Sequence, residues 1–134
     1  MDKQTKNNGS VILMVVFIIA LMSTIVMGIA QLNTEELLIM TNQINSTKAL
    51  ETAYAGLNDA FAELYFDSSW TNGFTNKSFN GGSYTVSVTG SYPNLTLTST
   101  ATTQQGYIAK AESDVSVSSS SPYTVRVDEL RINE

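Results

Sequence analysis

The sequence predicts an α+β protein in which one long N-terminal α-helix packs on an antiparallel β-sheet. Three observations carry this prediction. An uncharged apolar run lies near the N-terminus, it continues into an amphipathic helical pattern, and the remaining residues alternate between apolar and polar with a period of two. We therefore expect four parts: a polar leader at 1–9, a transmembrane helix at 10–33, an amphipathic helix at 34–66 and an antiparallel β-sheet domain at 67–134.

The apolar run is long enough to cross a bilayer. No Asp, Glu, Lys or Arg occurs between Val11 and Leu32. The segment Val11–Ala30 has 20 residues, and at roughly 1.5 Å per residue they span about 30 Å, the thickness of the hydrocarbon core. Ser23 and Thr24 interrupt the run, but their hydroxyls can bond to the helix backbone. We therefore expect a single membrane span.

The charges that flank the run predict its orientation. Lys3 and Lys6 precede it, and Glu35 and Glu36 follow it. Because positive residues are retained on the cytoplasmic side, we expect the N-terminus in the cytoplasm and the rest of the chain outside.

Three interpretations of this N-terminal region remain open. It could be a secretory signal peptide cut at the small residues Gly28-Ile29-Ala30, although the run exceeds the usual length of about 7–15 residues for a signal core. It could be a permanent single-span anchor. It could be a prepilin-type signal, cut on the cytoplasmic side so that the apolar helix stays with the mature protein. Gly9, at the boundary between the polar leader and the apolar run, meets the requirement of the third interpretation.

The amphipathic segment predicts a helix with one packing face. Small and apolar residues recur every three or four positions, and Phe61 widens the stripe that they form. No Pro occurs before Phe66, so we expect one continuous helix from Val11 to Phe66, although Thr34 could cap a separate one. The stripe consists of Leu50, Ala53, Leu57, Ala60 and Leu64.

The C-terminal half predicts four strands, each with one apolar and one polar face. The alternating runs cover 84–89, 95–102, 109–117 and 123–128. The short links between them favour an antiparallel meander whose apolar face is covered by the helical stripe. Asn80-Gly81-Gly82 is expected to open the first strand. A change of phase at Leu130 and Ile132 predicts a bulge near Asp128 and Glu129. Aromatic residues are expected to seal the edge between helix and sheet, namely Tyr65, Phe66, Trp70, Phe74 and Phe79.

The composition argues against several classes of function. The formal net charge is -5 and the cations are scattered, which disfavours nucleic-acid binding. The chain has no Cys and no His, so the usual activated nucleophiles and the commonest metal ligands are missing. We expect no enzyme activity, no cofactor and no metal.

These features together resemble type IV pilin-like subunits, especially minor pilins of the PilX type and pseudopilins of the general secretion K type. The resemblance rests on the leader ending Lys6-Asn7-Asn8-Gly9, the start of the apolar run at 10–17, the helical segment 53–60 and the strand at 97–102. It covers most of the chain and implies a pilin-like fold.

The resemblance implies a processing route and a structural function. A prepilin peptidase would cut after Gly9, and Ser10 would become the N-methylated first residue. Met14 would then be the fifth mature residue, where most major pilins carry Glu. Subunits of the K type also lack that Glu and are placed at the filament tip, so a tip-associated or assembly-priming role is expected. The segment with Met14, Val16 and Phe17 would mediate assembly.

The implied partners are other pilin or pseudopilin subunits, which bind through the N-terminal helix, together with the inner (cytoplasmic) membrane and the prepilin peptidase. The implied location is the inner membrane, with the N-terminus in the cytoplasm, and an extracytoplasmic filament after assembly. The alternative is a β-rich binding or adhesion domain that is either anchored in the membrane or secreted.

Overall fold

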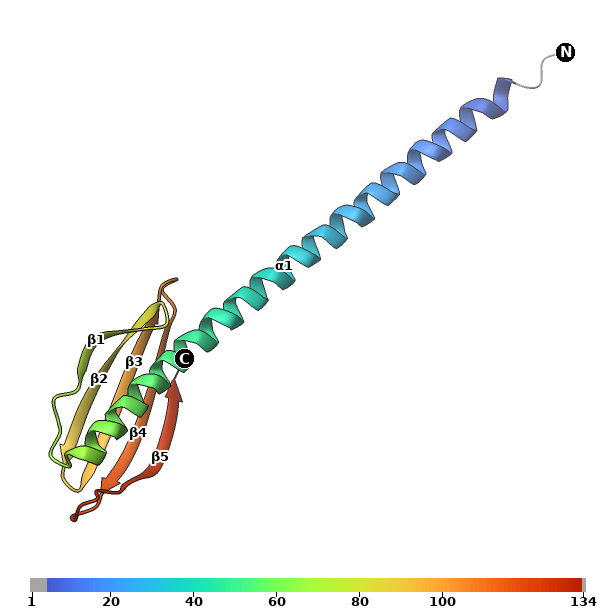
Figure 1. Cartoon of the computed structure of the whole chain (residues 1–134). Helices are drawn as coiled ribbons and strands as arrows, with labels where there is room; N and C mark the ends of the chain where they lie inside the picture. Colours follow the sequence, from blue (N-terminus) through green and yellow to red (C-terminus); the bar gives the residue numbers. More distant parts are fainter. Residues whose placement is uncertain (1–4, 134) are drawn as a thin grey trace. The chain divides into compact units, whose positions relative to one another are not determined.

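The computed structural model describes residues 5–133 and confirms the α+β fold (Figure 1). One helix, α1, comes first, and five strands follow it in a single antiparallel sheet whose spatial order is the chain order. The predicted meander is therefore confirmed. The elements of the described range are α1 (Thr5–Phe66), β1 (Phe74–Phe79), β2 (Gly82–Ser91), β3 (Asn94–Thr103), β4 (Ile108–Val117) and β5 (Val125–Asn133).

The helix α1 is continuous, as predicted. It ends at Phe66 as expected and begins at Thr5, earlier than the expected Val11. Thr34 does not start a second helix, because its hydroxyl donates to the Ala30 carbonyl oxygen one turn earlier at 3.0 Å. The residue bonds back into the helix instead of capping a new one.

The chain divides into two compact units, Met1–Thr41 and Asn42–Glu134. The second unit holds the C-terminal part of α1 and the whole sheet, so the helical stripe and the strands share one hydrophobic core. This core is formed by Ala53, Leu57, Ala60, Leu64, Trp70, Tyr84, Val86, Leu95, Leu97, Ala101, Ala111, Val115 and Val117.

The stripe on α1 covers the sheet with small side chains. Four of the five predicted stripe residues are buried, but Leu50 is only half-buried and the neighbouring Ala49 is buried instead. Gly56 lies where the helix comes close to the sheet. A Cβ at Gly56 would lie 2.3 Å from Ser99 Oγ and 2.8 Å from the Tyr84 ring. The absence of a side chain therefore permits this close approach.

The strands follow the predicted alternation. The inner positions of β3 and β4 are buried, including Ser99 and Ser113 among the apolar residues. The predicted bulge in β5 is confirmed: Val127 pairs with Val115 and Glu129 pairs with Asp114, so Asp128 is an extra residue.

Strand β1 is an addition to the four predicted strands. Asn80 and Gly81 both have positive φ, 45° and 79°, as a type I′ turn requires, and they join β1 to β2. Asn80-Gly81-Gly82 leads into the strand that contains 84–89, as expected, but that strand is the second one, because the segment turns a hairpin. The sequence of β1 does not predict a strand, because five of its six residues are exposed and they show no apolar alternation.

The expected aromatic seal is only partly present. Trp70 is buried and packs against the half-buried Phe74, with ring centroids 5.2 Å apart and the ring planes tilted by 48°. The prediction was wrong for Tyr65, Phe66 and Phe79, which are exposed. Leu64 occupies the sheet-facing position of the last helical turn. Since successive helical residues are rotated by about 100°, Tyr65 and Phe66 point elsewhere.

Candidate functional site

The candidate site in the first unit is the apolar stretch of α1. Large apolar side chains occur on all sides of the helix between Val11 and Leu32, and nearly all of them are exposed. At the expected assembly positions, Met14, Val16 and Phe17 are 65 %, 60 % and 64 % exposed. A helix that is apolar all round needs an apolar environment, either lipid or other protein surfaces.

The polar groups in this stretch are satisfied within the helix. Ser23 Oγ donates to the Ile19 carbonyl oxygen at 2.8 Å, and Thr24 Oγ1 donates to the Leu21 carbonyl oxygen at 2.7 Å. Such internal bonds remove the need for water, which the hydrocarbon core does not provide. The helix is thus long and apolar enough to cross a membrane.

The expected processing residues lie at the start of the apolar stretch. Gly9 and Ser10 are exposed in α1, and no atom lies within 4 Å of where a Cβ on Gly9 would be. Met14 follows about one helical turn after Ser10 in the same helix. The five expected site residues therefore share one accessible helical segment, but cleavage after Gly9 and methylation of Ser10 stay predictions.

A second exposed apolar segment lies beyond the predicted membrane span. Leu37, Leu38, Ile39 and Met40 are 57–64 % exposed. They follow the acidic residues Glu35-Glu36 and lie in the same helix. The sequence interpretation missed this segment, although four consecutive apolar residues inside a segment expected to be amphipathic are a usable signal.

In the second unit, Asp59 connects the helix to the sheet. Lys77 Nζ lies 2.6 Å from Asp59 Oδ2, and the Tyr84 hydroxyl donates to the same oxygen. Hydrogen bonds from Lys77 and Tyr84 lower the pKa of Asp59 below its usual value. Burial, and then the bond to Asp59, raise the pKa of Tyr84. This cluster fixes α1 beside β1 and β2.

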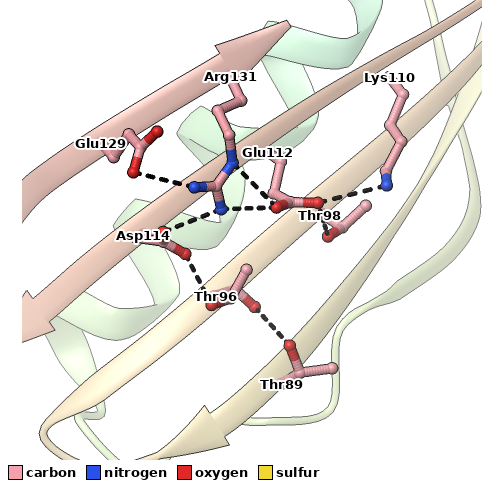
Figure 2. A network of polar contacts seen from close by, with 8 residues as sticks. All are labelled: Thr89, Thr96, Thr98, Lys110, Glu112, Asp114, Glu129 and Arg131. Atoms are coloured by element: carbon pink, nitrogen blue, oxygen red, sulfur yellow. Dashed lines mark hydrogen bonds and ion pairs between the residues drawn. The ribbon is translucent and has the colours of Figure 1, made fainter. Parts of the chain in front are cut away.

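The outer face of the sheet carries a charged network centred on Arg131 (Figure 2). The Arg131 guanidinium lies 2.6 Å from Glu112 Oε1, 2.9 Å from Asp114 Oδ2 and 2.9 Å from Glu129 Oε2. Thr96 Oγ1 donates to Asp114 Oδ1 at 2.7 Å. The hydrogen bond from Arg131 lowers the pKa of Glu112, and chiefly the bond from Thr96 lowers the pKa of Asp114.

This network joins the two strands β4 and β5. Arg131 comes from β5 and its carboxylate partners come from β4 and β5, so the ion pairs bridge the last two strands. Over the part of the chain that the structure describes, no group of three or more acidic residues is arranged to hold a metal ion.

Comparison with known proteins does not add a family to this picture. No protein-family model, no curated protein and no solved structure matches the chain.

Proposed function

We propose that this chain is a pilin-like minor subunit of a type IV pilus or of a type II secretion-like filament. The observation that supports the proposal is an exposed apolar helical stretch, Val11–Leu32, that continues without a break into a separately folded sheet unit. One part needs an apolar environment, and the other part has a hydrophobic core of its own. A membrane-stored assembly subunit requires this combination.

The proposed mechanism is an exchange of surroundings. Before assembly, lipid covers the apolar stretch and the flanking charges hold the N-terminus in the cytoplasm. On assembly, helices of neighbouring subunits replace the lipid around Met14, Val16 and Phe17. Packing between close helical surfaces then stabilises the filament.

Processing after Gly9 would prepare the subunit for assembly. The N-methylated Ser10 would become the first residue, and Met14 would stand fifth. Met14 has no carboxylate to neutralise the terminal amine of a neighbouring subunit, and an unpaired buried ammonium is costly. A position at the filament tip or a priming role avoids that cost, so we assign the subunit there.

The second candidate is a β-rich binding or adhesion domain that is anchored or secreted. The division of the chain favours it, because the second unit contains its own core and does not need the first 41 residues for that core.

Intact-mass analysis of the natural product separates these functions. A chain that begins at methylated Ser10 supports the assembly subunit. A chain that begins at Gln31 would show plain secretion, and an uncut chain beginning at Met1 would show a simple anchor. Either of the last two results contradicts prepilin processing.

A charge in the apolar stretch provides the functional test. Val16→Asp is expected to block membrane retention or filament incorporation, because a charge inside the hydrocarbon core is unfavourable, by up to about 2.5–3.5 kcal/mol at its centre on insertion scales. Val16→Leu is the matched control and should behave as the unchanged protein. The fluorescence of Trp70, the single Trp, should stay native in both. Normal incorporation of Val16→Asp would contradict the proposed role of the helix.

A further inference from the structure

Two exposed asparagines of the sheet unit are each followed by glycine, namely Asn72 before Gly73 and Asn80 before Gly81. This pairing has a chemistry of its own. The backbone nitrogen of the glycine can attack the side-chain carbonyl carbon of the asparagine, because glycine has no Cβ that blocks the approach. The attack requires a rotation of the asparagine backbone, which hydrogen-bonded structure resists. The fold therefore decides which of the two pairs reacts.

The hairpin between β1 and β2 holds Asn80 and Gly81 in place. Both residues have positive φ, 45° and 79°, and their neighbours Phe79 and Gly82 are paired across the two strands. A type I′ turn fixes the backbone of both central residues, so Asn80 cannot rotate without breaking the strand pair beside it. The turn therefore protects Asn80 from this reaction.

Asn72 lies in a stretch that belongs to neither α1 nor β1. The last turn before it is closed by Trp70 N, which donates to the Asp67 carbonyl oxygen at 3.1 Å, and strand pairing begins only at Phe74. The backbone of Asn72 can therefore rotate without breaking a strand pair or a helical turn. The dipeptide sequence does not distinguish Asn72 from Asn80, but the fold does.

We propose that Asn72 is a site of spontaneous deamidation and isomerisation. The Gly73 nitrogen forms a bond to Asn72 Cγ and loses its proton, and the side-chain nitrogen leaves as ammonia, which closes an imide ring. Water then adds to one of the two ring carbonyl carbons and breaks its bond to the Gly73 nitrogen. Opening at Cγ gives aspartate, and opening at the backbone carbon gives isoaspartate. The net change is the gain of water and the loss of ammonia.

The isoaspartate product should disturb the start of β1. It adds a carboxylate to an uncharged position and one carbon atom to the backbone. Gly73 lies close to β2, because a Cβ on it would be 2.2 Å from the Val86 carbonyl oxygen, and its φ is +67°. The longer backbone must therefore displace the chain between Trp70 and Phe74, whose rings pack together at this edge of the sheet.

This inference goes beyond the proposed function and does not depend on it, because the reaction needs only water. Its effect is confined to the edge strand, since β2, β3, β4 and β5 are paired with one another independently of the stretch before β1. The modification is thus a slow covalent change that marks the age of the folded chain.

Peptide mapping of the aged full-length chain tests the proposal. The protein is kept in micelles in a mildly alkaline buffer, sampled over time and digested with trypsin, which separates the two asparagines because it cleaves after Lys77. Mass spectrometry locates the deamidated residue, and an isoaspartyl methyltransferase labels the isoaspartate. We expect Asn72 to convert about tenfold faster than Asn80, which corresponds to roughly 1.4 kcal/mol of protection by the hairpin.

The same chain unfolded in denaturant is the matched control. Both asparagines precede glycine, so they should convert at similar rates once the hairpin is lost. The proposal would be overturned by equal rates in the folded chain, by faster conversion of Asn80, or by an unreactive Asn72 under conditions where the unfolded chain reacts.

Two variants separate the reaction from its effect on the fold. Asn72→Gln keeps the amide but lengthens the side chain, which disfavours ring closure, and Asn72→Asp supplies the charge without the extra backbone carbon. Trp70 fluorescence should change as the unchanged chain ages, but it should stay native in aged Asn72→Gln and in fresh Asn72→Asp. The same change in aged Asn72→Gln would contradict a cause at Asn72, and the same change in fresh Asn72→Asp would contradict the displacement by the longer backbone.

Discussion

The two units use the same helix in opposite ways. In Asn42–Glu134, the sheet-facing side of α1 is built from small residues such as Ala53, Gly56 and Ala60, and they are buried. In Met1–Thr41, the helix carries large branched or flexible residues on all sides, and they are exposed. Small residues let a helix approach a sheet that its own chain provides. Large residues around the whole circumference require cover from outside the chain.

The comparison is tested most strongly by truncating an apolar side chain in each unit. Leu57→Ala removes a fully buried side chain, so it should lower the free energy of unfolding of the second unit by about 2–5 kcal/mol. Leu21→Ala is the matched change in the first unit and should leave that value unchanged, because Leu21 is exposed there. Denaturant titration of the full chain in micelles, followed by Trp70 fluorescence, measures both. An equal loss of unfolding free energy in the two variants would contradict the difference between the two units.

The two mid-helix glycines offer a sharper contrast. Gly56→Ala places a Cβ against Ser99 and Tyr84, so the helix must shift and the second unit should lose about 1–3 kcal/mol. Gly28→Ala meets no atom within 4 Å and should have no effect on that unit. The same titration is the measurement. A neutral Gly56→Ala would show that the close approach to the sheet is dispensable.

The hydroxyls in the two units should also respond differently. Ser113 Oγ is buried without a hydrogen-bond partner, and Ser99 Oγ shares this condition. Ser113→Ala should therefore raise the unfolding free energy by about 1 kcal/mol, since an unsatisfied buried polar group is unfavourable. Ser23→Ala removes a hydroxyl bonded to its own helix and should change nothing in the second unit. A loss of stability in Ser113→Ala would reveal a bond that this hydroxyl makes in solution.

The smallest expected effect is a dependence on pH. The pKa of Asp59 is lowered in the fold, chiefly by hydrogen bonds from Lys77 and Tyr84, so its ionised form favours folding. That contribution is present above the ordinary pKa of 3.8 and is lost as the pH falls through the lower folded value. Asp59→Asn should flatten this acid loss, and unfolding titrations between about pH 5 and about pH 2 measure it. If Asp59→Asn leaves the dependence of stability on acid pH unchanged, Asp59 does not contribute to the helix–sheet contact in the way proposed.

Most of the fold could be predicted from the sequence because two periodicities are clear. The stripe through Ala53, Leu57 and Leu64 follows the helical repeat, and four strands show alternation with a period of two. The bulge at Asp128 was also predictable, because a strand whose apolar residues change phase needs an extra residue to keep them on one face. β1 was missed because it has no alternation, although Asn80-Gly81 is a strong hairpin signal.

The candidate site could be predicted only in part. The exposed stretch Val11–Leu32 followed from its composition and length. The half-exposed row of Val127, Leu130 and Ile132 on β5 could not be predicted, because its exposure depends on where α1 rests across the sheet. That position is set by contacts between distant residues, namely Gly56 with Ser99 and Asp59 with Tyr84, and no local pattern reveals it. Local sequence predicts which side chains share a face of a strand, but it does not predict which of them are buried beneath the helix.

Asp128 gives the last strand an unusual tolerance to shortening. Deleting this one residue would return β5 to uninterrupted pairing, and because Glu129 already pairs with Asp114, every residue after it would keep its face. Pairing all nine residues without a bulge would instead direct Arg131 at the core and turn Leu130 and Ile132 to the outer face. Related chains should therefore accept the omission of Asp128 more readily than a change that keeps the residue and flattens the bulge.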